Sequence, residues 1–92
     1  YSFNERNFSF MQTMNHCIQA AEGMHARPAG VLAKTASAYQ STVNLHFQDK
    51  CINAKRMLAI MTLGLQQGDA IRIDIEGEDE IAAAQALTKV LI

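Results

Sequence analysis

The segment from Gly23 to Gly30, GMHARPAG, carries the residues of this chain that are best suited to chemistry. His25 stands two positions before Arg27, and Pro28 follows where a helix would begin. Backbone N–H groups in the first turn of a helix have no partner within it and lie at the positive end of its dipole. They can bind an anion, and the planar guanidinium of Arg27 suits phosphate oxygens. The segment therefore predicts a histidine that accepts a phosphoryl group, stabilised near Ala26 and Arg27.

The other histidines and both cysteines form no comparable pattern. His16 lies in the apolar phase of a predicted strand, and His46 lies in the polar phase of another. Neither has neighbours at a metal-binding spacing, so we expect no metal and no cofactor. Cys17 and Cys51 form no redox or metal-binding motif, and reduced thiols are expected for a cytoplasmic protein.

Composition and charge exclude several classes of protein. The chain has 92 residues, a net charge of −1 and 18% charged residues, which fits one globular domain with a single core. A charge this small gives no general attraction to nucleic acid or anionic membranes, so a charged partner must be met by a local patch. No apolar run is long enough to cross a bilayer, and nothing resembles a signal peptide. We therefore expect a cytoplasmic protein that binds neither nucleic acid nor membrane.

The first ten residues fit none of the patterns that follow them. Residues 1–10 read YSFNERNFSF, and Met11 offers a natural start for the domain. We therefore expect an N-terminal extension or a remnant of expression at 1–10 and one domain at 11–92.

Alternating apolar residues predict four strands. The strands cover about 12–19, 42–47, 51–53 and 71–76. The last is the clearest, because Ile71, Ile73 and Ile75 alternate with charged residues. Residues 48–50 supply a short turn, so the second and third strands form a hairpin. Such alternation predicts a sheet with one face in water and the other covered.

Three helices are predicted, at about 26–39, at 54–63 and from 78–80 to the end of the chain. Asn53 is the expected cap of the second helix and Gly64 its end. The residues expected to face the core are Leu32, Thr35, Ala36 and Tyr39 in the first helix, Ile60 and Leu63 in the second, and Ile81, Ala84, Leu87 and Leu91 in the last. The order β-α-β-β-α-β-α predicts a two-layer, open-faced α+β sandwich.

Three segments together resemble the HPr family, the histidine-containing phosphocarriers of the bacterial phosphoenolpyruvate:sugar phosphotransferase system. They are GMHARPAG after the first strand, NAKRMLAIMTLG along the second helix and IRIDIEGEDE at the last strand. The resemblance covers about 12–91 and implies a four-stranded antiparallel sheet in the order 1-4-2-3, covered on one face by three helices. It also implies that enzyme I phosphorylates Nδ1 of His25, and that an enzyme IIA domain then receives the group.

The resemblance also bears on the cysteines and on the kind of activity. In that strand order Cys17 and Cys51 would lie on opposite edges of the sheet, too far apart for an intramolecular disulfide. A carrier of this family reacts only with its partner proteins and is not a self-sufficient enzyme. A monomer is the default expectation.

A partner-docking surface on the first two helices, around the histidine, is a further implication of the resemblance. Its expected residues are Gly30, Val31, Lys34, Lys55, Arg56, Met57, Leu58 and Met61. Helical spacing agrees, because it turns Ile60 and Leu63 inward and leaves the methionines and Leu58 outward. Flexible apolar side chains suit docking to several partners in turn. Gly30 costs the helix about 1 kcal/mol relative to alanine, and either close approach of a partner backbone or simple tolerance accounts for it.

Arg56 is the main departure from the family. Many relatives have a regulatory serine there, which an ATP-dependent kinase phosphorylates, whereas arginine has no hydroxyl group. Lys55 and Arg56 make the start of the second helix basic, which suits an acidic partner. Two functions stay open: a phosphocarrier, or an HPr-like regulatory binding module whose phosphorylation state controls partner proteins. The sequence also leaves open a general carrier or a specialised paralogue, and which sugar or other acceptor pathway it serves.

Overall fold

A computed structural model describes residues 11–92 of the protein, and the predicted extension at 1–10 lies outside them. The predicted order of elements is confirmed, and strand limits differ from expectation by one or two residues. The elements are β1 (Gln12–Cys17), α1 (Ala26–Ser37), β2 (Thr42–Phe47), β3 (Lys50–Asn53), α2 (Met57–Thr62), β4 (Ala70–Glu76) and α3 (Glu80–Val90).

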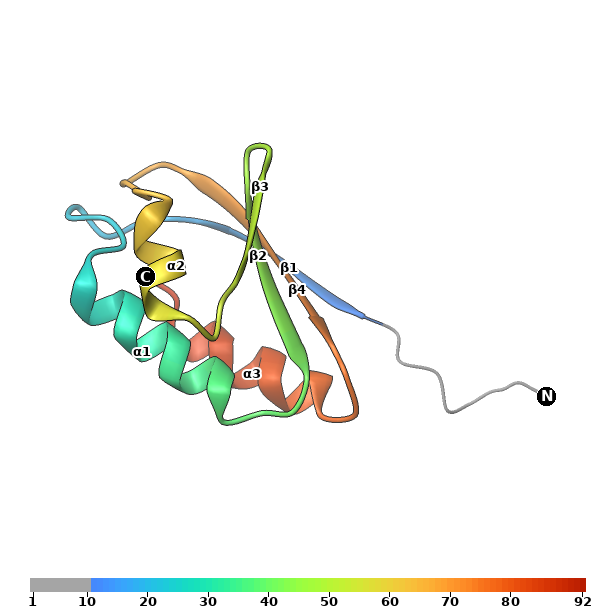
Figure 1. Cartoon of the computed structure of the whole chain (residues 1–92). Coiled ribbons are helices and arrows are strands. Elements are labelled where there is room, and N and C mark those ends of the chain that lie inside the picture. The colour runs from blue at the N-terminus through green and yellow to red at the C-terminus, as the bar shows by residue number, and fades with distance from the viewer. Residues whose placement is uncertain (1–10) are drawn as a thin grey trace.

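The four strands form one antiparallel sheet in the order β1-β4-β2-β3. Met14 of β1 lies opposite Ile73 of β4, which in turn lies opposite Leu45 of β2. The three helices cover one face of this sheet and leave the other face bare (Figure 1). The open-faced sandwich and the strand order implied by the family resemblance are therefore confirmed.

The core lies between the sheet and the helices. From the sheet, the alternating isoleucines of β4 and Leu45 of β2 are buried, while Arg72 and Glu76 of β4 are exposed. From the helices, Leu32, Ile60 and Leu87 are fully buried. Each such aliphatic side chain contributes about 1.5–3 kcal/mol when it leaves water.

In α1, the predicted buried stripe is partly right. Leu32 and Ala36 are buried, but Thr35 is only half-buried, and so is Tyr39, which lies beyond the end of the helix at Ser37. Ala29 and Ala33 take their place in the core. Small alanine side chains suit this position, because α1 packs against both α2 and α3.

In α3, the predicted inward position of Ile81 is wrong. Ile81 is 62% exposed, whereas Glu80 is buried together with Ala83 and Leu87. The physical reason is the Glu80 carboxylate, which accepts the N–H of Gly77 at 3.1 Å and the side-chain amide of Gln12 at 3.3 Å. These bonds turn position 80 inward and position 81 outward. Of the other predicted residues, Leu87 is buried and Ala84 and Leu91 are half-buried.

The second helix begins three residues later than predicted, at Met57, and its N-cap is Arg56 in extended conformation. Asn53 does not cap it, because its Oδ1 accepts the N–H of Lys55 at 2.9 Å and closes a local turn first. The end of the helix is as predicted, since Gly64 follows the C-cap with a φ of 60°.

The two cysteines lie on the opposite edge strands β1 and β3, and both are free and exposed. Their placement on opposite edges of the sheet is the one that the family's strand order implied. Among residues 11–92, the structure contains no helix of the length and hydropathy that crossing a membrane requires.

Candidate functional site

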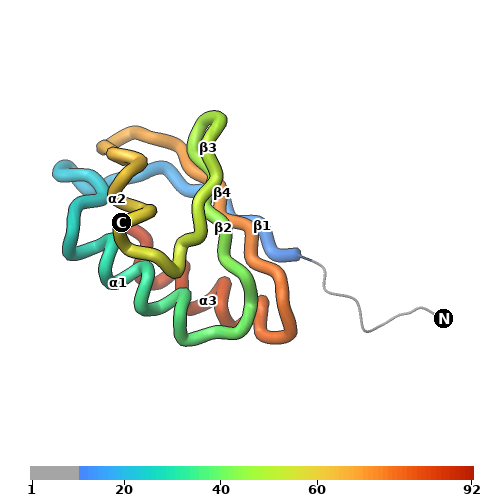
Figure 2. Tube along the Cα trace, viewed as in Figure 1, coloured from blue at the N-terminus to red at the C-terminus, as the bar shows by residue number. Residues whose placement is uncertain are grey.

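The segment that carries His25 is held by contacts between two loops. The N–H of Met24 donates to the carbonyl of Leu65 at 3.0 Å, and the N–H of Gly68 donates to the carbonyl of Ile18 at 2.8 Å. Figure 2 shows the β1–α1 and α2–β4 loops side by side. Gly23 is required here, because its φ is 74° and a Cβ atom would overlap the Leu65 carbonyl oxygen. The main chain therefore enters α1 in a fixed direction.

His25 is the N-cap residue of α1. Its backbone is extended, with φ −88° and ψ −168°, its side chain makes no capping bond, and its carbonyl accepts the N–H of Ala29 at 3.0 Å. Pro28 lies in the first turn, where a missing N–H costs the helix nothing. The imidazole ring is thus not used to cap the helix, and it lies at the end of α1 where the first-turn N–H groups of Ala26 and Arg27 begin.

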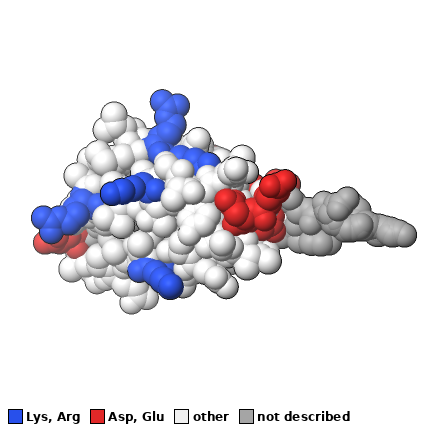
Figure 3. Space-filling model, turned by 90° about the horizontal axis from the view of Figure 1, so that it is seen from below, with Lys and Arg blue, Asp and Glu red and all other residues white. Residues whose placement is uncertain are grey.

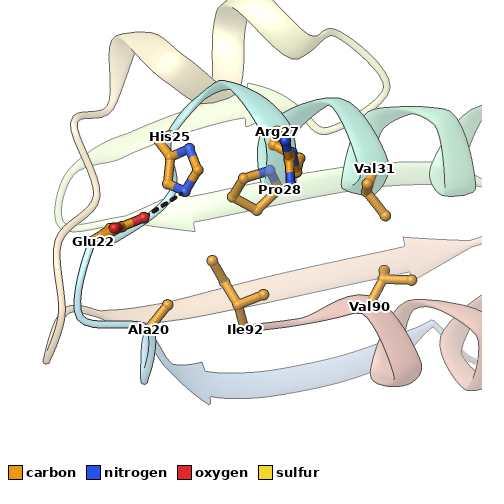
Figure 4. Close-up of a pocket in the computed structure, with 8 residues that line it drawn as sticks. All are labelled: Ala20, Glu22, His25, Arg27, Pro28, Val31, Val90 and Ile92. Carbon is orange, nitrogen blue, oxygen red and sulfur yellow. Dashed lines mark ion pairs between the residues drawn. The ribbon is translucent and has the colours of Figure 1, made fainter.

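Within residues 11–92, the imidazole ring of His25 has one partner, Glu22. Oε1 of Glu22 lies 3.3 Å from Nε2 of the ring, and the two side chains are 83% and 49% exposed. Figure 4 shows the other ring nitrogen, Nδ1, turned away from Glu22. The ring is therefore held at one nitrogen and accessible at the other. Sequence reasoning missed Glu22, and its spacing three residues before the histidine is the signal that points to it.

A cavity of about 390 Å³ opens beside this ring. Its polar side chains, from Glu22, His25 and Arg27, lie at the start of α1 (Figure 4). The rest of its lining is apolar and comes from Ala20, Pro28, Val31, Val90 and Ile92. Arg27 is exposed and makes no ion pair with any other residue in 11–92. Its guanidinium is available to an anion brought to the ring.

An exposed apolar patch lies on α1 and α2 next to the site. We call Val31, Met57, Leu58 and Met61 the apolar patch; they are 44%, 38%, 72% and 37% exposed. Ile60 and Leu63 are buried, so the predicted phase of the second helix is confirmed.

The presence of a glycine at position 30 is explained by packing within the chain itself. A Cβ atom at this position would lie 3.2 Å from Sδ of Met57. The glycine thus lets Met57 of α2 pack closely across α1, which neither of the two sequence-based explanations anticipated.

The four basic residues predicted near the site are not equivalent. Arg27, Lys34 and Arg56 are exposed. Lys55 is half-buried, and its Nζ donates to the carbonyl of Tyr39 at 2.9 Å, just beyond the end of α1. Lys55 therefore joins α1 to the start of α2 rather than facing outward. On the helical side of the molecule, basic side chains are spread over the surface and acidic ones gather mainly toward one end (Figure 3).

His16 and His46 lie away from this site. His16 is a half-buried residue of β1, and its buried Nε2 has no hydrogen-bond partner in the described part of the chain. His46 lies on β2, where its Nε2 is 3.1 Å from a carboxylate oxygen of Asp74. No group of three or more His, Cys, Asp or Glu residues within 11–92 is arranged to hold a metal ion.

The fold and the site are those of a small α+β protein, an open-faced sandwich that exposes a histidine at the start of its first helix. Comparison with known proteins identifies the family. The family model described as the PTS HPr component phosphorylation site matches residues 13–92, so the chain belongs to the HPr family. This assigns it the general role of a phosphocarrier of the phosphotransferase system.

Individual relatives agree with this assignment. The chain is 39% identical over 74 residues to the phosphocarrier protein HPr of Buchnera aphidicola, covering 80% of this chain and 87% of that protein. The structure matches a histidine-containing phosphocarrier protein of Mycoplasma with a TM-score of 0.84 and 33% identity, covering 86% and 90% of the two chains. It also matches an HPr dimer from Thermoanaerobacter tengcongensis with a TM-score of 0.68 and 40% identity, covering 74% and 78%.

Proposed function

We propose that His25 accepts a phosphoryl group on Nδ1 from phosphorylated enzyme I and passes it to an enzyme IIA-type acceptor. The observation that carries this proposal is the half-exposed ring at the start of α1, with Nε2 occupied by Glu22 and Nδ1 accessible. Membership of the HPr family supports it.

The chemistry follows from the position of the ring. The Nδ1 lone pair attacks phosphorus, a P–N bond forms, and the donor leaves with the electron pair of its own bond to phosphorus. The negative oxygens of the group then meet the first-turn N–H groups of α1 and the guanidinium of Arg27. Because the site is open, the group stays reachable for the next acceptor.

The apolar patch, together with Lys34 and Arg56, is proposed as the docking surface for both partners. A carrier needs brief contacts, which correspond to interfaces below about 1,200 Å². Exposed methionines adapt to differently shaped partners, and the basic residues around them attract acidic surfaces and speed the encounter. Lys55 serves this surface indirectly, by fixing the start of α2 against α1.

The direct test uses phosphoenolpyruvate and purified enzyme I. The wild-type protein should gain one acid-labile phosphate, with the ³¹P shift of an Nδ1-phosphohistidine. His25→Ala should stay folded and gain none, while the control variants His16→Gln and His46→Gln should be phosphorylated normally. Acid-labile phosphate on His25→Ala would contradict the assignment.

A second candidate function is left open by Arg56, the N-cap residue of α2, which occupies the position of the regulatory serine of many relatives. On this view the chain is a regulatory binding module whose phosphorylation state controls partner proteins. A panel of enzyme IIA domains separates the two functions. A carrier delivers its phosphoryl group to at least one of them within seconds, whereas a regulatory module keeps the group and changes its affinity for a partner instead.

We further propose that the protein acts as a monomer in the cytoplasm. The T. tengcongensis relative forms an HPr dimer, so assembly has to be measured for this chain. Sedimentation velocity across a range of concentrations should give a single species of about 10 kDa, in line with the chain mass of 10.1 kDa.

A further inference from the structure

We propose that Glu22 is a positioning residue for phosphoryl transfer: its carboxylate keeps the proton of the His25 ring on Nε2 and so leaves a lone pair on Nδ1. This inference rests on the proposed function. It adds the residue that sets the protonation pattern of the ring, which neither the sequence pattern nor the family assignment supplies.

The geometry fixes the roles of the two side chains. An ionised carboxylate only accepts hydrogen bonds, so the contact between Oε1 of Glu22 and Nε2 of His25, at 3.3 Å, requires the proton on Nε2. A neutral imidazole has one N–H, and the bond made by one nitrogen decides the state of the other. Nδ1 is then the unprotonated, nucleophilic nitrogen.

The main chain supports this contact. Glu22 and His25 flank Gly23 and Met24, whose N–H groups donate to the carbonyls of Ala20 and Leu65. The carboxylate and the ring therefore start from anchored backbone positions, although both side chains reach into solvent. Glu22 and Arg27 are the charged groups that line the cavity beside the ring.

With the proton on Nε2, phosphoryl transfer requires no proton movement at the ring. When Nδ1 attacks phosphorus, the ring becomes a cation that keeps its Nε2–H, and the adjacent carboxylate stabilises that positive charge. In the outward step the P–N bond breaks, its electron pair returns to Nδ1, and a neutral imidazole leaves. Without the Nε2 proton the leaving group would be an imidazolate anion, which is a far poorer one.

The size of the effect is limited by exposure. Solvent-exposed pairs of this kind change equilibria by a factor of about two to five. We therefore expect loss of Glu22 to reduce the population of the Nε2–H tautomer, and the rate of the transfer step, by about that factor. A large loss of stability is not expected, because Glu22 is 83% exposed.

The first experiment reads the tautomer directly on the unphosphorylated protein. Imidazole ¹⁵N shifts of His25 are measured at alkaline pH, where the ring is neutral, for wild type, Glu22→Gln and Glu22→Ala. Glu78→Gln is the matched control, because it removes an exposed carboxylate on the turn between β4 and α3 (Figure 1). The Nε2–H population should fall in Glu22→Ala, fall less in Glu22→Gln, whose amide oxygen still accepts, and stay unchanged in Glu78→Gln.

The second experiment measures phosphorylation by enzyme I in the same variants. A positioning role lowers kcat by about two- to fivefold in Glu22→Ala, with partial rescue in Glu22→Gln and with KM unchanged. An unchanged tautomer in Glu22→Ala would overturn the proposal, and so would a change confined to KM, which is the signature of electrostatic docking. If wild type accepts no phosphate at all, the proposed function fails, whereas the tautomer measurement still decides whether Glu22 sets the state of the ring.

Discussion

Replacement of Leu58 by glutamate separates docking from folding at the centre of the apolar patch. Leu58 is 72% exposed, whereas Ile60, two residues along the same helix, is fully buried. Burying a whole leucine side chain contributes about 1.5–3 kcal/mol. The exposed part of Leu58 can therefore add about 1–2 kcal/mol to a docked complex, which corresponds to a five- to thirtyfold change in affinity by the usual conversion of about 1.4 kcal/mol per decade.

The assay follows phosphoryl transfer from phosphorylated enzyme I over a range of carrier concentrations. Leu58→Glu should raise KM by about five- to thirtyfold, or more if the new carboxylate is forced out of water. Its unfolding free energy should change by no more than about 0.5 kcal/mol, as at other exposed positions. The control Ile60→Ala should lose about 2–5 kcal/mol of stability because it leaves a cavity.

Two results would refute this reasoning. If Leu58→Glu unfolds, the side chain contributes to the core and the phase of α2 is wrong. If it folds and transfers at the wild-type KM, docking lies elsewhere on the surface.

Three further outcomes are expected. The family's ATP-dependent serine kinase should leave α2 unmodified, because Arg56 has no hydroxyl group; a stoichiometric phosphate on Thr62, detected by mass spectrometry, would show that the regulatory site has moved. The hydroxyl of Ser41 and the N–H groups of Gln40 and Ser41 lower the pKa of Asp79 in the folded protein. The Asp79 carboxylate therefore stabilises the fold fully at pH values above the pKa of an aspartate in the unfolded chain, about 3.9. This stabilisation is lost as the pH falls through the lower pKa of the folded state. Urea midpoints measured against pH should show this acid dependence in wild type and lack it in Asp79→Asn. Finally, Gly23→Ala should cost at least about 1–2 kcal/mol because of its positive φ, and urea denaturation that finds no loss would contradict the conformation described.

Much of the fold could be predicted because more buried and more exposed residues alternate along β1 and β4. The isoleucines of β4 recur at every second position, and strict alternation permits only one assignment of faces. The end of α2 could also be predicted from Gly64, since this glycine adopts the positive φ that is common at helix ends. The strand order came from family resemblance, because periodicity does not say which strands are neighbours.

The errors in the last two helices have a common physical origin in side chains that bond to nearby backbone. Glu80 accepts the N–H of Gly77 and thereby sets the phase of α3 against the pattern of apolar residues. Asn53 closes a turn with Lys55 and delays the start of α2. A pattern of hydrophobic residues does not predict such bonds, because the sequence does not distinguish a polar residue that faces the core from one that faces water.

The functional site could likewise be predicted only in part. His25, Arg27 and the outward residues of α2 follow from motif and spacing. Glu22 does not follow from them alone: its spacing of three residues before His25 is a weak signal, because such a spacing is common, and the structure is needed to show that the two side chains meet.

The hydrogen bond between Met24 and Leu65 also has a consequence for how the molecule opens locally. It joins the segment that leads into His25 to the segment that follows α2, so we expect these two regions to open together in the native state. Amide protons of Met24 and of the buried residues of α2 should therefore exchange with solvent at similar free energies of opening. If the two regions open together, a molecule whose histidine segment has opened would also lose the docking surface on α2. It would then hold no partner in an unproductive complex.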